Sequence, residues 1–275
     1  MDPLNWHGIA LDAETALALL EWQAEMGVDE PVGDAPVDRF DLAARPDVSP
    51  PPAAATAAAA VLRLEPEGDD LPARVVQAEA LAAGADTLDA LAAAQESFDG
   101  IELKKGARNF CFADGNPAAR LLILGEAPGD EEDRQGRPFV GRAGLLLDRM
   151  FDAIGLSRRA VDAEKALYIT NVLTWRPPGN RDPQPDEIAM SLPFVRRHIE
   201  LAAPDLVVLM GNIACDAGLG RRGILRLRGN WTTAFDRPAL PMTHPAYLLR
   251  NPPAKREAWA DLLSLSARLE ERGGR

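Results

Sequence analysis

The stretch LLILGEAPGDEED, residues 121–133, joins an apolar run directly to a loop that holds two glycines, a proline and five acidic residues. Three further apolar runs, at 167–173, 205–211 and 239–244, are equally short and rich in branched side chains. Runs of this length that end in turn-forming residues are typical of strands buried on both faces. The sequence therefore predicts four buried strands, and the acidic loop begins where the first of them ends.

Helical patterns follow these predicted strands. Apolar residues recur at helical spacing in 143–155, 185–202 and 254–271. Alternation of strands and helices predicts an α/β fold with a central parallel sheet flanked by helices on both faces, an α/β/α sandwich. In such sheets, ligands bind beyond the carboxyl ends of the strands. The residues that carry function are therefore expected in the loops that follow the strands.

The N-terminal part of the chain has a different composition. An amphipathic pattern at 9–26 predicts one helix, an Ala-rich pattern predicts a second at about 76–98, and PDVSPPPAAATAAAA at 46–60 is a low-complexity tether. Chemistry-bearing motifs are absent from this part of the sequence. We therefore predict an acidic Ala/Pro-rich extension over 1–95, whose partner is unknown, and a catalytic domain over 96–275.

Charge and composition restrict the class of protein. The net charge of −12 is uneven, because residues 1–100 hold 20 acidic and 4 basic residues whereas 101–275 hold 22 acidic and 26 basic ones. The mildly cationic C-terminal part is compatible with a nucleic-acid partner. The sequence has no apolar run of 18 residues, no basic secretory leader and only two cysteines, so we expect a cytoplasmic protein without a disulfide framework.

Three predicted loops bring polar and aromatic residues to one edge of the sheet. They are GEAPGDEEDRQGRPFVGRAG at 125–144, the segment from Asn171 through TWRPPGNR, and HPAYLLRN at 244–251. A phosphate-binding role for the first loop is disfavoured, because its five carboxylates would repel phosphate and both GxGxxG and GxxxxGK[ST] are absent. Each motif alone is weak evidence, but the ordered set is specific.

This set of motifs resembles the uracil-DNA glycosylase superfamily, and most closely its iron–sulfur-containing family 4. The resemblance runs from about residue 98 to about residue 265. It implies a monomeric DNA repair enzyme that binds uracil-containing DNA, turns the uracil out of the helix and hydrolyses its N-glycosidic bond to leave an abasic site.

The resemblance also implies roles for individual residues. Phe139 would stack on the base, and Asn171 would present its side-chain amide to the edge of uracil. His244 would donate a hydrogen bond to uracil O2 as negative charge builds on the leaving base. Ala127 and Gly129 would line the same pocket, and Gly129 stands where some uracil-specific relatives carry a tyrosine, so specificity is expected to be looser.

Activation of water is the open part of the implied mechanism. Related families place Asp or Asn at the position of Ala127 to hold the attacking water. Here that task falls to Glu126, Glu132 or Asn180, or the base departs before water attacks, and the sequence does not choose between these alternatives. The acidic side chains, with Asp133 behind them, would also stabilise the cationic sugar of the transition state. Lysine is absent from every motif, so a monofunctional enzyme is expected.

DNA contacts are expected from two of the loops and from a basic run. Leu248 and Leu249 would wedge into the space that the base leaves, with Arg250 on a phosphate. Arg176 and Arg181, together with RRGILRLR at 221–228, would contact the DNA backbone.

A metal site is not expected. The cysteine pattern of family 4 falls on Phe98, Ile101, Trp175 and Ser191, and an iron–sulfur cluster needs thiolates. We therefore predict that the chain carries no iron–sulfur cluster and that these residues fill the space by packing.

Two other functions remain open. A non-catalytic or weakly catalytic protein that binds damaged bases with the same fold would fit the loss of Asp or Asn at position 127. A nucleotide-binding α/β regulator is the more distant alternative, and it would bind free nucleotides and ignore DNA.

Overall fold

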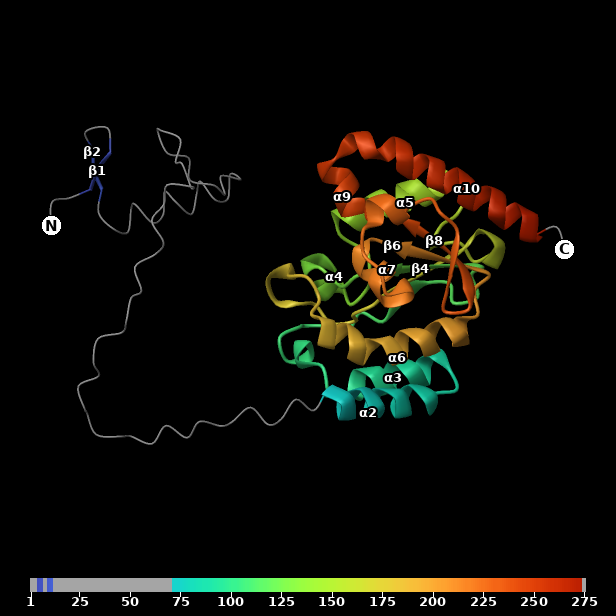
Figure 1. Cartoon of the computed structure of the whole chain (residues 1–275), viewed down its shortest axis with the longest axis horizontal. Helices are drawn as coiled ribbons and strands as arrows, with labels where there is room; N and C mark the ends of the chain where they lie inside the picture. Colours follow the sequence, from blue (N-terminus) through green and yellow to red (C-terminus); the bar gives the residue numbers. More distant parts are fainter. Residues whose placement is uncertain (1–3, 7–8, 12–70, 274–275) are drawn as a thin grey trace, which may run out of the picture. The chain divides into compact units, whose positions relative to one another are not determined.

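The computed structural model describes residues 4–6, 9–11 and 71–273 (Figure 1). The chain divides into two compact units, Met1–Leu62 and Arg63–Arg275. In the first unit, β1 (Leu4–Trp6) and β2 (Ile9–Leu11) form an antiparallel pair. The predicted helix at 9–26 is therefore wrong at its start, because Ile9–Leu11 pairs with a second strand. The remainder of that prediction and the tether at 46–60 lie outside the described residues.

A six-stranded sheet forms the centre of the second unit, in the order β3-β5-β4-β6-β8-β7. The four inner strands, β5 (Leu167–Asn171), β4 (Leu121–Gly125), β6 (Leu206–Met210) and β8 (Arg237–Met242), are parallel. They correspond to the four predicted strands. The edge strands β3 (Ala113–Gly115) and β7 (Thr232–Ala234) are antiparallel to their neighbours and were not predicted.

Helices cover both faces of this sheet, which confirms the α/β/α class (Figure 1). Successive side chains of a strand point to opposite faces. Leu121 and Ile123 pack with α5 (Arg142–Asp152) and α10 (Lys255–Gly273), whereas Leu122 and Leu124 pack with α6 (Pro185–Ala202) and α7 (Asn212–Leu219). Both faces of the sheet are covered, so almost every residue of an inner strand is buried on one face or the other. This is why the inner strands are largely apolar.

A third helical layer lies outside α6. The predicted helix at about 76–98 is two helices, α2 (Leu71–Ala83) and α3 (Leu88–Ser97), and Thr87 caps α3 by accepting a hydrogen bond from the backbone of Ala90 at 3.1 Å. Both helices contact α6, and Ala78 and Leu91 are fully buried there. The expected boundary at 95/96 therefore falls inside α3, within the helical layer that packs on α6.

Short elements follow the carboxyl ends of the inner strands and shape that edge of the sheet. After β4 comes α4 (Asp130–Gln135), after β5 the 3-10 turn η3 (Pro178–Asn180), and after β8 the helix α9 (Pro245–Arg250). The remaining short helices are α8 (Ile224–Leu227), η1 (Glu102–Lys105), η2 (Ala163–Lys165) and η4 (Pro252–Ala254). Among the described helices, none combines the length and the apolar character that crossing a membrane requires.

Candidate active site

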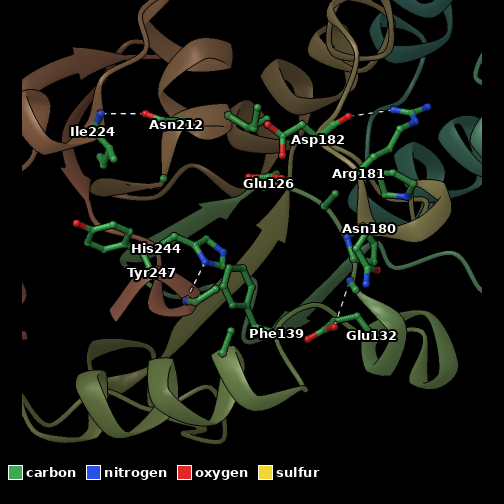
Figure 2. Close-up of a pocket in the computed structure, with 18 of the residues that line it drawn as sticks. Glu126, Glu132, Phe139, Asn180, Arg181, Asp182, Asn212, Ile224, His244 and Tyr247 are labelled. Carbon is green, nitrogen blue, oxygen red and sulfur yellow. Dashed lines mark hydrogen bonds between the residues drawn. The ribbon is translucent and has the colours of Figure 1, made fainter. Parts of the chain in front are cut away.

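A cavity of about 610 Å³ lies at the carboxyl ends of the parallel strands (Figure 2). Its walls come from the loop after β4, the η3 loop, the start of α7 with the loop before α8, and α9. Of the residues predicted to act on the base, the structure brings Ala127, Gly129, Phe139 and His244 into this lining. The carboxyl ends of parallel strands must lie at one edge of the sheet, which is why loops far apart in the sequence meet here.

Phe139 lies in the cavity wall with its ring against that of His244, at 5.4 Å between ring centroids. Its backbone is in the left-handed region (φ 54°), which is unfavourable for a bulky residue. The conformation is held from both sides, because Arg158 donates a hydrogen bond of 2.9 Å to the Phe139 carbonyl and Gly144 approaches that carbonyl closely. A Cβ atom on Gly144 would lie 1.7 Å from the carbonyl oxygen. The ring is therefore held by a strained but well-braced loop.

His244 caps α9, and this contact sets its protonation. The backbone N–H of Ala246 donates to Nδ1 at 3.1 Å, so Nδ1 carries no proton and Nε2 is the protonated nitrogen of the neutral ring. Burial, helped by the charge of Arg250, lowers the pKa of His244 to about 4. The ring is therefore a neutral Nε2–H donor near pH 7. His198, by contrast, is a core residue, 2.9 Å from the hydroxyl of Tyr168.

Asn171 ends β5 immediately beside Phe139. A Cβ atom on Gly125 would lie 2.2 Å from Asn171 Oδ1 and 2.4 Å from Phe139 Cε2, so only glycine lets the two side chains approach. The Asn171 side chain is 2% exposed and does not belong to the cavity lining. Both Oδ1 and Nδ2 are buried without a hydrogen-bond partner among the described residues. Such an amide costs about 1–3 kcal/mol unless something else pairs with it.

The three side chains considered for water activation differ in how they are bound. Glu132 is a brace, because its carboxylate accepts hydrogen bonds from the backbone N–H groups of Gly129 (3.2 Å), Val140 (2.9 Å) and Gly141 (2.8 Å). Asn180 Oδ1 accepts a hydrogen bond from Arg176 Nε at 2.8 Å. Both residues line the cavity, but their oxygens are already engaged.

Glu126 is the exception. Its half-buried side chain faces the cavity, and its carboxylate accepts no hydrogen bond from the residues that the structure describes. Burial raises the pKa of Glu126, the charge of Asp182 raises it further, and Arg222 opposes both effects. Asp133, which was expected behind the other acids, is 2% exposed and accepts hydrogen bonds from the backbones of Arg108 and Asn109.

Of the two leucines expected to wedge into the DNA, only Leu249 is exposed. Leu248 is 1% exposed and packs beside α5 and α10, so its prediction as a wedge is wrong. Leu249 is 37% exposed, and Arg250 is exposed and lines the cavity. Neighbouring residues of a helix differ by about 100° in direction, which lets Leu248 point into the core while the adjacent Leu249 points outward.

The expected backbone-binding arginines already have acidic partners. Arg176 pairs with Asp130 at 2.7 Å, and Arg181, which lines the cavity, pairs with Glu187 at 2.6 Å. In the basic run at 221–228, Arg228 is turned into the protein against the buried Asp261, so it is not a DNA contact. Arg222 is exposed at the cavity.

The positions of the family 4 cysteines are filled by packing. Phe98, Ile101, Trp175 and Ser191 are all less than 9% exposed, and the rings of Phe98 and Phe194 lie 5.6 Å apart. Cys111 and Cys215 are buried elsewhere, and burial raises the pKa of each thiol to about 12, which disfavours the thiolate that a metal needs. In the described part of the chain, no group of three or more His, Cys, Asp or Glu side chains is arranged to hold a metal ion. The residues present therefore do not fit an iron–sulfur cluster.

Several lining residues were missed by the sequence analysis. The most relevant are Asp182, Asn212 and Tyr247. Asn212 lies two residues after the end of β6, so the expectation that functional residues follow the strands also applies to it. Asp182 directly follows Arg181, the last residue of the motif TWRPPGNR, but no local sequence pattern predicts where its side chain points.

Comparison with known proteins agrees with this geometry. A family model described as the uracil DNA glycosylase superfamily matches residues 112–263. A type-4 uracil-DNA glycosylase of Thermotoga maritima is 40% identical over 148 residues, which cover 52% of this chain and 73% of that protein. One from Saccharolobus solfataricus is 35% identical over 181 residues, with 62% and 81% covered. A type-5 enzyme of Pyrobaculum aerophilum is 30% identical over 131 residues, with 44% and 54% covered.

Proposed function

This chain belongs to the uracil DNA glycosylase superfamily, and we propose that it is a monofunctional uracil-DNA glycosylase of base excision repair. It hydrolyses the N-glycosidic bond of a uracil turned out of DNA and leaves an abasic site. The observation that carries the proposal is the buried amide of Asn171, unpaired among the described residues, beside Phe139 and next to the cavity that Phe139 shares with His244.

Recognition of the base rests on Phe139 and Asn171. The amide oxygen accepts from uracil N3–H and the amide nitrogen donates to O4, which cytosine cannot match because its corresponding edge has the reverse pattern. Since the Asn171 side chain is 2% exposed, uracil reaches it only where the Phe139 ring moves enough to admit the base. The ring then stacks on the base face, and pairing of the amide recovers part of the cost of flipping.

Departure of the base rests on His244. As the bond between C1′ and N1 breaks, its electron pair passes to the base and negative charge appears on O2. A neutral Nε2–H donor directed at O2 stabilises that charge at the moment it forms. The hydrogen bond from Ala246 to Nδ1 supports this role, because it keeps the proton on the nitrogen that faces the reaction.

Attack of water rests on Glu126. A water molecule bonds to C1′ while its proton passes to a base, and Glu126 has the carboxylate whose oxygens are not already engaged by the described part of the chain. Its negative charge also stabilises the cationic sugar. Glu132 and Asn180 hold the cavity wall in shape, and Leu249 and Arg250 contact the DNA.

The reaction as proposed needs neither a metal nor a cofactor. The apolar packing of Phe98, Ile101 and Trp175 at three of the family 4 cysteine positions supports a chain that folds and acts without an iron–sulfur cluster. We also propose that the chain acts as a monomer. Activity of iron-free protein, together with a monomer mass in solution under assay conditions, tests both statements.

Release of free uracil from a single-stranded oligonucleotide with one deoxyuridine tests the activity. We expect stoichiometric uracil and an abasic site that alkali cleaves, with no strand cleavage before alkali. The same oligonucleotide with cytosine, whose edge Asn171 is expected to reject, is the matched control. Tight binding without release would favour the non-catalytic damaged-base-binding protein instead.

A further inference from the structure

A second carboxylate faces Glu126 across the cavity. Figure 2 shows the side chains of Asp182 and Glu126 pointing toward one another from the loops that follow β5 and β4. The segment that carries Asp182 is firmly held, because Arg181 forms a double ion pair with Glu187 and also donates to the carbonyl of Asp182 at 3.0 Å. The carboxylate of Asp182 is therefore kept at the rim of the cavity.

A cation reaches the same cavity from a third loop. Arg222 lines it and is held by an ion pair of 2.8 Å with Asp216 of α7. Its loop is fixed by Asn212, whose Oδ1 accepts hydrogen bonds from the backbones of Gly223 (3.0 Å) and Ile224 (2.9 Å). Glu126 is thus subject to the electrostatic effects of the negative Asp182 and the positive Arg222.

We propose that Asp182 and Arg222 are opposed positioning residues that set the charge state of Glu126 for water activation. This inference rests on the proposed function. Asp182 disfavours the ionised form of Glu126 and makes it a stronger base, whereas Arg222 favours ionisation and keeps the base available near neutral pH. Neither residue needs to touch the reacting atoms.

The direction of each effect follows from charge. Burial and Asp182 raise the pKa of Glu126, and Arg222 lowers it. Other charged or titratable side chains around the cavity are Glu132, Arg181, His244, Tyr247 and Arg250. Because Asp182 and Arg222 are exposed, salt screens their effects, and both should shrink as ionic strength rises.

The experiment is the pH dependence of the single-turnover rate of uracil release, at low ionic strength, for the full chain. Since the base must be ionised, the rate falls as pH drops through the pKa of Glu126. Asp182→Asn removes a negative neighbour, so this acid limb should move to lower pH. Arg222→Gln removes a positive neighbour, so the limb should move to higher pH. Glu126→Gln should lower the rate about a hundredfold or more and abolish the limb.

A matched control isolates the effect of the two charged neighbours on Glu126. Asp186→Asn changes an exposed acid of α6 outside the cavity lining, and its limb should match that of the unmodified chain. A limb that survives Glu126→Gln would belong to another group, such as His244, and would overturn the inference. Limbs that stay in place, or move the same way in the Asp182 and Arg222 variants, would also overturn it. Failure of the unmodified chain to release uracil would instead overturn the proposed function.

Discussion

Two regions of the molecule contain a buried polar side chain without a hydrogen-bond partner among the described residues, and they differ in what surrounds it. Asn171 lies at the end of β5, beside Phe139 in the wall of a cavity lined by charged side chains. Ser191 lies on α6, the helix that contributes Met190 and Phe194 to an apolar cluster with α2 and α3. Both side chains are at most 2% exposed.

The difference shows when an unpaired polar group indicates function. At Asn171, a cavity, an aromatic ring and a neutral histidine donor lie within the same set of loops, so a ligand that enters can pair with the amide. Around Ser191, the neighbouring positions are filled by aromatic and aliphatic side chains, including Phe98 and Trp175. Without adjoining space and chemistry, an unpaired hydroxyl is a small cost in stability and predicts no activity.

The largest effect is expected at the cavity, from His244→Ala. Loss of the Nε2–H donor should lower the single-turnover rate about 10²–10³-fold, as loss of an oxyanion-hole donor does. His244→Asn is the matched variant, because an asparagine retains a capping acceptor for the start of α9. Both variants should lose the rate, but only His244→Asn should keep the thermal midpoint close to that of the parent, because alanine removes the cap of α9. A nearly intact rate in either variant would remove His244 from the chemistry.

An intermediate effect is expected from Asn171→Asp. The rate on uracil should fall about 10- to 100-fold, since a buried group that loses its partner costs roughly 1–3 kcal/mol. Cytosine, which presents a donor where uracil presents O4, should become a weak substrate. The measurement compares release from oligonucleotides that contain either base. Unchanged discrimination between them would mean that Asn171 does not read the base and that its unpaired amide is equivalent to the hydroxyl of Ser191.

The smallest effect is expected from Ser191→Ala. The rate of uracil release should not change, and the free energy of unfolding should rise by up to about 1 kcal/mol, because an unpaired buried hydroxyl is removed from a helix. Chemical denaturation and the uracil assay on the same preparation measure the two quantities. A lower rate at full stability would connect the apolar cluster to the active site and break the contrast.

Much of the site followed from local sequence patterns. Buried strands predicted the inner sheet, the helix at 185–202 has the predicted bounds, and parallel strands oblige the loops of Phe139 and His244 to meet. The different roles of the acidic residues could not be predicted from these patterns. Glu126 in the loop after β4 and Glu132 in α4 are only six residues apart. Yet Glu126 faces the cavity unbound by the described residues, whereas Glu132 accepts hydrogen bonds from three backbone amides.

The amino-acid sequence by itself determined the α/β/α class and the edge of the sheet at which the site lies, because hydrophobic periodicity and the alternation of strands with helices depend on neighbours along the chain. Only the tertiary structure decided which carboxylate is left without a hydrogen-bond partner among the described residues, that Leu248 points inward, and that Asp182 faces Glu126. Those outcomes depend on hydrogen bonds and packing between segments that are distant in sequence. A local sequence pattern does not indicate which distant group will contact a given side chain.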